Sequence, residues 1–217
     1  MAWNFADQIH SLTGFDADLE SASETGEYYS VLAQQWLTDA AKEIINYLPP
    51  NLLKLCTSKV AFGADSKVPG SEAETLNTGK VLSVFAGNYE AREIPSSFKH
   101  KANDSDSIEY ATITDPVFYI EGNKINILPS GLTAATLIYE EVQYPAVAFD
   151  ATNILVFPDE AEYLVPIRAS ITAAEYQSAI EEDPELFVPI IQTLKQDYMQ
   201  GLQAIGVQMA QPQQGGR

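Results

Sequence analysis

The fold class of this chain is decided by the stretch Val117-Phe118-Tyr119-Ile120-Glu121-Gly122-Asn123-Lys124-Ile125-Asn126-Ile127-Leu128. Two short apolar runs flank a Glu-Gly-Asn turn, which is the pattern of a β-hairpin. Phe118 and Ile120 share one face of the first strand, because side chains alternate along a strand, and the isoleucines of the second run supply the answering strand. The stretch therefore predicts antiparallel sheet in the middle of the chain.

Further short strands are expected on both sides of this hairpin. Val81–Ala86 and Tyr89–Ile94 predict a second hairpin around Gly87-Asn88, and Ile108–Ile113 alternates. Thr136–Tyr144 and Asn153–Phe157 complete the set. Short strands joined by turns predict an antiparallel barrel or sandwich over residues 80–157, and both remain open because strand order is not readable from sequence.

Helical patterns flank this β-rich domain. From 26 to 48, apolar residues recur at three and four positions between a Thr25 cap and Pro49-Pro50, and 51–56 is expected to add a turn. Acids at 159–160 start a second helix that runs to about Ile180, with Pro166 expected to kink it or delay its start. A third helix opens at Asp183-Pro184. Its apolar face consists of Phe187, Ile190, Ile191, Leu194, Tyr198 and Leu202.

The predicted class is therefore α+β, with a helical domain of residues 27–58 and 158–206. Residues 1–26 are expected to be an N-terminal arm, and the Gln-, Pro- and Gly-rich residues 207–217 a flexible tail. Exposed Trp3 and Phe5 would be a liability in a monomer, so the arm is expected to pack on its own core or on a neighbouring subunit. Lys59–Thr78, which is rich in Gly, Ser and Ala, predicts a loop.

The charge of the chain limits its partners. Thirty Asp and Glu against twelve Lys and Arg give a net charge of −18, so phosphate-backbone binding is not expected as the principal task. Met1 to Asp39 contains no Lys or Arg, whereas bases outnumber acids from Lys42 to Lys101. This asymmetry fits either subunits that meet acidic end to basic middle or simple solubility.

Composition points to a globular protein made in a reducing compartment. The apolar fraction is 46%, no apolar run is long enough to cross a bilayer, and the first ten residues lack the pattern of a signal peptide. Cys56 is the only cysteine, so no internal disulfide is possible.

A search for chemistry finds no catalytic, cofactor-binding or metal-binding residues, and an enzyme is not expected. His10 and His100 lack a second ligand at zinc spacing, and no G-x-S-x-G or phosphate-binding glycine motif is present. Asp104-Ser105-Asp106 begins like a calcium loop, but Ile108 stands where an oxygen ligand belongs. A hydrolase built on an unrecognised acid pair remains an alternative, since thirty acids always offer some pair.

The order of these elements resembles the head-to-tail adaptor (tail-tubular or neck) proteins of tailed bacteriophages. The resemblance is carried by the hairpin stretch from Thr114 to Pro129, by the strand end at Tyr144-Pro145, and by the helix start Phe157-Pro158-Asp159-Glu160-Ala161-Glu162-Tyr163. It covers Glu27 to Gly206.

The resemblance implies a virion structural protein at the head–tail junction, made in the host cytoplasm, without cofactors or membrane contact. Copies would form a closed ring, usually of about twelve, through which DNA passes without specific binding. The final helix and tail (Phe187 to Arg217) would dock on the portal protein. The arm, with Trp3 and Phe5, or the loop Gly63–Thr78 would contact an adjacent subunit or a tail or nozzle protein. The alternative within the same class is a baseplate, tail-completion or capsid-decorating protein.

Overall fold

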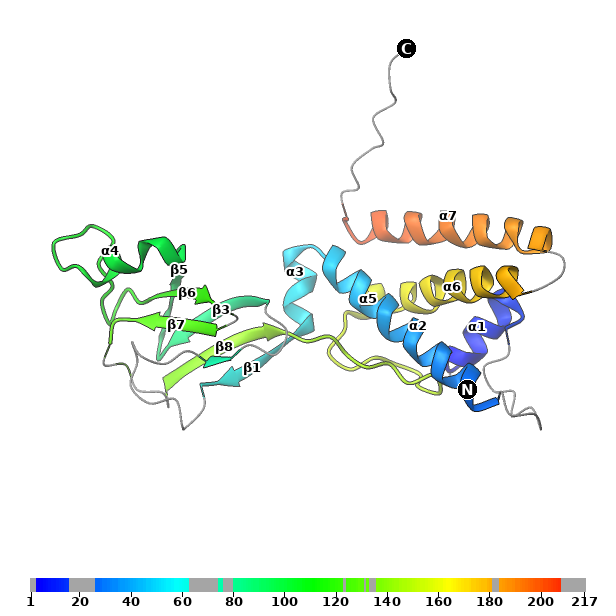
Figure 1. Cartoon of the computed structure of the whole chain (residues 1–217), viewed down its shortest axis with the longest axis horizontal. Coiled ribbons are helices and arrows are strands. Elements are labelled where there is room, and N and C mark those ends of the chain that lie inside the picture. Colours follow the sequence, from blue (N-terminus) through cyan, green and yellow to red (C-terminus); the bar gives the residue numbers. More distant parts are fainter. Residues whose placement is uncertain are drawn as a thin grey trace, which may run out of the picture. The chain divides into compact units, whose positions relative to one another are not determined.

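The computed structural model describes residues 3–15, 26–62, 74–75, 80–122, 124–130, 132, 136–180 and 184–207. The chain divides into two compact units (Figure 1). A helical unit comprises Met1–Cys56 and Tyr144–Arg217, and a β unit, Thr57–Gln143, is inserted between its two parts. The mixed helix and sheet confirm the predicted α+β class in general terms. The sequence placed the limits of the β-rich domain later, at 80 and 157.

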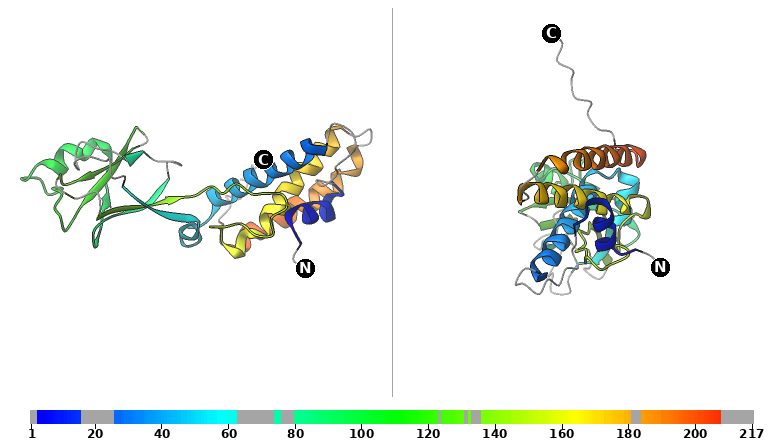
Figure 2. Two further views of the ribbon diagram at one scale, coloured as in Figure 1. Left: turned by 90° about the horizontal axis from the view of Figure 1, so that it is seen from below. Right: turned by 90° about the vertical axis from the view of Figure 1, so that its right-hand side faces the viewer.

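The helical unit is organised around one central helix. Its α-helices are α1 (Phe5–Thr13), α2 (Gly26–Tyr47), α3 (Pro50–Leu53), α5 (Asp159–Glu162), α6 (Leu164–Ile180) and α7 (Val188–Ala204). Helix α6 packs against α1, α2 and α7 (Figure 2). Its buried positions include Ala169, Ser170, Ala173 and Ala174, whose small side chains let neighbouring helices approach closely. Pro166 lies in the first turn of α6, where its missing N–H costs nothing.

Helix α1 belongs to the core of the helical unit. The Asn4 side chain accepts a hydrogen bond from the Asp7 amide at 2.7 Å, and the Asp7 side chain accepts one from the Asn4 amide, which forms a capping box. Gly14 closes the helix with a φ of 74°. Phe5 is buried and its amide donates to the carbonyl of Ala151, so Phe5 packs on its own core, while Trp3 is 60% exposed.

Over its described residues, the β unit contains two four-stranded sheets. The first has the order β1 (Thr57–Ala61), β8 (Leu137–Val142), β3 (Val81–Ala86), β4 (Tyr89–Glu90), all antiparallel. The second has the order β2 (Glu74–Thr75), β7 (Lys124–Leu128), β6 (Val117–Glu121), β5 (Arg92–Glu93), with β5 parallel to β6. The hairpin predicted over 117–128 is confirmed as β6–β7, with Ile120 opposite Ile125.

The two sheets share one core. Val84, Leu137 and Tyr139 from the first sheet are buried in a single cluster with Phe118, Ile125 and Ile127 from the second. The chain crosses between the sheets at Ala91, whose amide donates to the carbonyl of Val84. Over the described residues the sheets do not close into a barrel. The short helix α4 (Lys99–Asn103) covers a smaller buried cluster beside β6 and β7.

Four expectations for strands and loops were wrong. The expected strand Tyr89–Ile94 is split into β4 in the first sheet and β5 in the second. Ile108–Ile113 is a loop, because its two isoleucines are exposed and form no buried face. Asn153–Phe157 is a turn in which Ile154 and Phe157 are buried at a spacing of three, with Val156 at a positive φ of 58°. The expected loop Lys59–Thr78 contains most of β1 and all of β2.

Several other predictions concern residues outside the described ranges. These are the Thr25 and Asp183 caps, most of the loop Gly63–Thr78, the part of the arm between Asp16 and Glu24, and the tail from Gln208 onward.

Candidate interaction surfaces

A polar bridge joins three helices of the helical unit. Arg168 on α6 donates from Nε to Glu43 Oε2 on α2 at 2.9 Å, and Tyr198 on α7 donates its hydroxyl to Glu43 Oε1 at 3.2 Å. Arg168 also donates to the Thr172 hydroxyl at 2.9 Å. Both carboxylate oxygens of Glu43 thus accept a hydrogen bond. A carboxylate held in this way is suited to linking helices and not to accepting a substrate proton.

The bridge changes the acidity of Tyr198. Burial raises the pKa of its phenol well above the usual value, and the negative charge of Glu43 raises that pKa further. Tyr198 therefore stays neutral over the physiological range and acts as a hydrogen-bond donor. The bridge is an anchor for α7.

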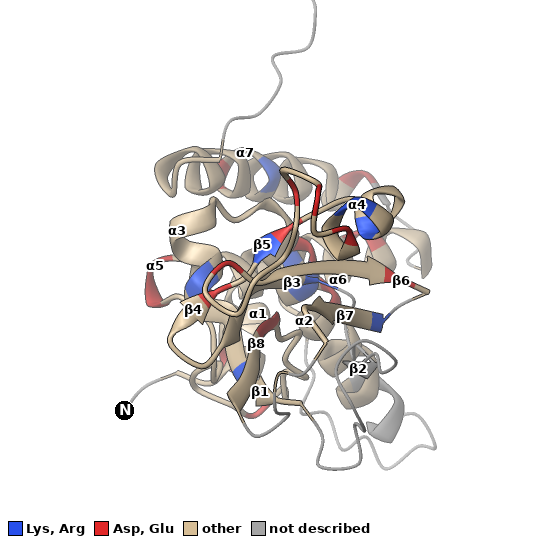
Figure 3. Cartoon of the chain, turned by 90° about the vertical axis from the view of Figure 1, so that its left-hand side faces the viewer, with Lys and Arg blue, Asp and Glu red and all other residues tan. Residues whose placement is uncertain are grey.

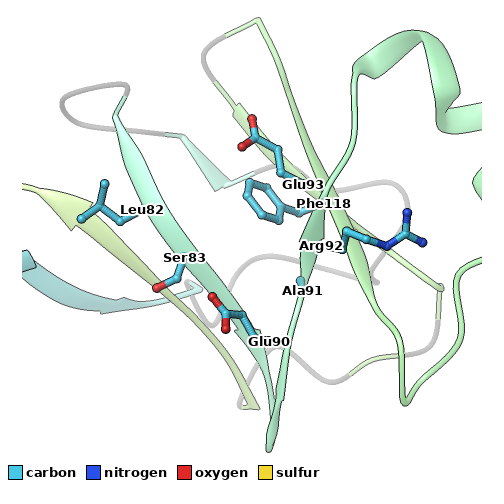
Figure 4. Close-up of a pocket in the computed structure, with 7 residues that line it drawn as sticks. All are labelled: Leu82, Ser83, Glu90, Ala91, Arg92, Glu93 and Phe118. Carbon is cyan, nitrogen blue, oxygen red and sulfur yellow. The ribbon is translucent and has the colours of Figure 1, made fainter. Parts of the chain in front are cut away.

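The β unit has a pocket of about 390 Å³ at the corner where the chain passes from the first sheet to the second (Figure 4). Its lining consists of Leu82, Ser83, Glu90, Ala91, Arg92, Glu93 and Phe118. In the close-up, Arg92 points away from Ser83 and Glu90. Ser83 donates to Glu140 at 2.8 Å, and the lining contains no histidine to serve as a base. The pocket could bind a polar group, but it lacks a nucleophile–base pair of the Ser–His kind.

Arg92 is held from outside the pocket. Its guanidinium donates to Glu109 at 2.8 Å and to Asp115 at 3.4 Å. The hydrogen bond to Glu109 is the main cause of the raised pKa of Arg92. Its effect is larger than that of burial, which lowers this pKa. Arg92 thus ties strand β5 to the segment that follows α4.

That segment, residues 104–115, is termed here the Ile108 loop. Ile108 is 99% exposed and Ile113 is 65% exposed. The loop nevertheless has a defined backbone. The buried Ala111 at its base donates its amide to the carbonyl of Ala102 on α4. The prediction from sequence missed this surface, because the alternating pattern of Ile108–Ile113 was interpreted as a strand. One feature of the sequence could have indicated an exposed loop: from Asp104 to Asp115 it has four acidic residues and no Lys or Arg.

The predicted partner residues on α7 fall into two groups. Leu194, Tyr198 and Leu202 are buried on the side of α7 that packs on α6. Phe187, Ile190 and Ile191 are half-buried at the start of the helix. The exposed Ile180, Leu186 and Val188 lie at the same end of the helical unit, at the close of α6 and the opening of α7, and sequence reasoning did not select them. This end, and not the middle of α7, offers apolar surface to a partner.

The described residues bring no metal-binding constellation together. No group of three or more His, Cys, Asp or Glu among them could hold an ion. His10 and His100 are exposed, and Cys56 is buried. The Asp104 side chain accepts a hydrogen bond from the Asp106 amide at 3.1 Å, so it closes a local turn. None of the described helices has the length and apolar character to span a bilayer.

No protein-family model matches this sequence, and no curated protein matches it.

Proposed function

We propose that this chain is a virion structural protein that forms a ring between the portal and the tail of a bacteriophage and serves as a conduit for DNA. The observation that supports the proposal is the order of its elements. A long helix (α2) leads into an inserted β unit, and an acid-led helix pair (α5, α6) and a last long helix (α7) follow. The resemblance to head-to-tail adaptors rests on this same order of elements.

The charge of the chain fits a passage for DNA. With a net charge of −18, its surface repels phosphate and would let a duplex slide without gripping it. In the β unit, Lys and Arg lie beside Asp and Glu around β5 and α4 (Figure 3), where Arg92 pairs with Glu109 and Lys99 with Glu121. Such paired bases are less available to the phosphates of a passing duplex.

Two surfaces suit the contacts that an adaptor makes. The apolar end formed by α6 and α7, with Leu186, Phe187 and Val188, is our candidate for the portal contact. The exposed Trp3 is our candidate for contact with an adjacent subunit. In this proposal the two sheets form a small sandwich, the chain holds no cofactor and performs no catalysis, and the protein is located at the head–tail junction of the virion after synthesis in the host cytoplasm.

Two alternatives have a specific observation in their favour. A baseplate, tail-completion or decorating protein would bind its partner through the exposed Ile108 loop without forming a ring. A hydrolase would use the β-unit pocket, where Ser83 contacts Glu140. The hydrolase is the weaker alternative, because no histidine lines the pocket to activate the Ser83 hydroxyl.

The location of the chain in the particle tests the proposal. Purified virions, carrying the chain with an epitope tag, would be imaged by electron microscopy with a labelled antibody. Label at the single head–tail vertex is expected. Label over the capsid or at the distal end of the tail would favour the other virion components, and absence of the chain from particles would leave the enzyme alternative.

A further inference from the structure

The Ile108 loop combines exposed apolar side chains with a firmly held backbone. Ile108 and Ile113 project from it, although a fully exposed isoleucine gains nothing in a monomer. Tyr110, 40% exposed, lies between them in sequence. The three side chains would together contribute the apolar centre of a small interface.

Hydrogen bonds within the loop hold this backbone in place. The Ser107 amide donates to the Asp104 carbonyl at 2.9 Å, and the Tyr110 amide donates to the Ser107 carbonyl at 3.1 Å. Near the other end, the Asp115 amide donates to the Thr112 hydroxyl at 3.0 Å. Arg92 clamps both Glu109 and Asp115. A loop ordered before binding loses less conformational entropy when it docks.

The charges around the isoleucines select the chemistry of the partner. Asp104 and Asp106 are exposed just before Ile108, and the loop contains no Lys or Arg. Carboxylates at the rim repel nucleic acid and anionic lipid headgroups and attract cationic side chains. A membrane surface or a duplex is therefore a poor fit.

A second copy of this chain is also a poor fit. Each copy carries a net charge of −18. Half of its twelve basic side chains are already in ion pairs within the chain, namely Lys42, Lys59, Arg92, Lys99, Arg168 and Lys195. A copy therefore has only part of its basic side chains left to meet an acidic rim.

We propose that the Ile108 loop docks into an apolar socket, bordered by Lys and Arg, on a protein different from this chain. The loop is separate from the α6–α7 end assigned above to the portal. An adaptor of this design binds two kinds of protein with its two units. The choice of probes for this inference rests on the proposed function, since the candidates are the other proteins of the head–tail junction.

The test measures binding of the full chain to the purified portal protein and to each purified tail protein of the same virion, by biolayer interferometry. A double variant, Ile108→Ser with Ile113→Ser, is compared with the control Leu155→Ser, which changes an apolar residue of the helical unit that is 77% exposed. We expect a tail protein to bind the wild type, the double variant to bind it about 10- to 100-fold more weakly, and the control to change affinity less than about twofold. Unchanged melting temperatures would show that the variants fold.

A second variant isolates the charge contribution. Asp104→Asn with Asp106→Asn is expected to weaken the same complex and to flatten its dependence on salt. Wild-type affinity in both double variants would overturn the docking role while leaving the adaptor proposal intact. Loss of self-association in place of partner binding would identify a second copy as the occupant and contradict the proposal. A wild-type chain that binds neither portal nor tail proteins would contradict both proposals.

Discussion

At the scale of single residues, Tyr198 shows how the helical unit holds its last helix. Its ring is buried against α6, and its hydroxyl reaches Glu43, which is 155 positions away in sequence. Arg168 approaches the same carboxylate from 125 positions away. These three residues meet only because α6 packs between α2 and α7, so no local pattern in the sequence could predict the bridge.

Replacement of Tyr198 by Phe is expected to lower the free energy of unfolding by about 0.5–1.5 kcal/mol at neutral pH, because one hydrogen bond to Glu43 is lost. The pKa of Tyr198 is raised in the folded state, so its contribution is complete below pH 10 and declines as pH rises above 10, where the unfolded chain ionises first. Urea unfolding at pH 7 and at alkaline pH measures both effects.

The Tyr198→Phe variant should therefore lose stability less steeply than the wild type above pH 10. Tyr163→Phe, at a tyrosine that is 47% exposed, is the matched control for the loss of a phenol hydroxyl and should change the stability at pH 7 little. An identical alkaline slope in Tyr198→Phe and wild type would contradict the assigned pKa direction.

At the scale of elements, the close approach of α7 to the α5–α6 junction depends on Gly201. A methyl group at this position would collide with the Leu164 side chain and would lie 2.9 Å from the Tyr163 hydroxyl oxygen. Leu164 is fully buried and has little room to move. The absence of a side chain at 201 therefore sets the distance between these helices.

Gly201→Ala is expected to lower the free energy of unfolding by about 1–3 kcal/mol, despite the better helix propensity of alanine, because the added methyl overpacks the contact. Gln203→Ala, at an exposed position of the same helix, is the control and should change stability little. Chemical denaturation measures both. A stabilised Gly201→Ala variant would show that α7 lies farther from α6 than described.

The two ion pairs of Arg92 are partly exposed and should matter more for loop order than for stability. Arg92→Ala is expected to change the free energy of unfolding by at most about 1 kcal/mol. Amide hydrogen exchange in residues 109–115 should accelerate, because the clamp on the Ile108 loop is removed. Lys99→Ala, which breaks a pair with Glu121 outside the loop, should leave that exchange unchanged. Equal rates of amide exchange in residues 109–115 of the two variants would contradict the proposal that Arg92 orders the loop.

The elements that were predicted correctly are those with a strong local pattern. The β6–β7 hairpin and α2 each bury a face whose period is visible in a short window. Helix α6, which packs against three neighbouring helices, was predicted from its acidic start at 159–160 and from the helical spacing of its apolar residues. Strand β1 was missed because its partner β8 lies about eighty residues later and only that pairing identifies it as a strand. Ile108 and Tyr110 in the Ile108 loop have a strand-like spacing of two but are exposed, so periodicity alone misled the prediction.

At the scale of the whole molecule, the chain pairs a helical unit and a β unit through two connections, at Cys56–Thr57 and Gln143–Tyr144. Each unit has its own core and its own exposed apolar surface. This organisation is suited to a protein that holds two different neighbours.

Removal of residues 208–217, which the structure does not describe, is expected to weaken binding to the portal protein, because segments that cannot fold alone order against a partner. Interferometry with immobilised portal protein measures the change. Replacement of the same residues by a Gly/Ser segment of equal length controls for length and should weaken binding to the same degree. Unchanged affinity after the deletion would contradict a role for residues 208–217 in portal binding and would leave the α6–α7 end as the proposed contact.

The central claim is that copies of this chain close into a ring on a portal. The most direct test is the mass of the purified protein in solution, alone and after mixing with its portal protein, measured by mass photometry or native mass spectrometry. We predict a closed oligomer of many copies, usually about twelve, that forms alone or appears when the portal is added. A chain that stays monomeric in both conditions would contradict the claim.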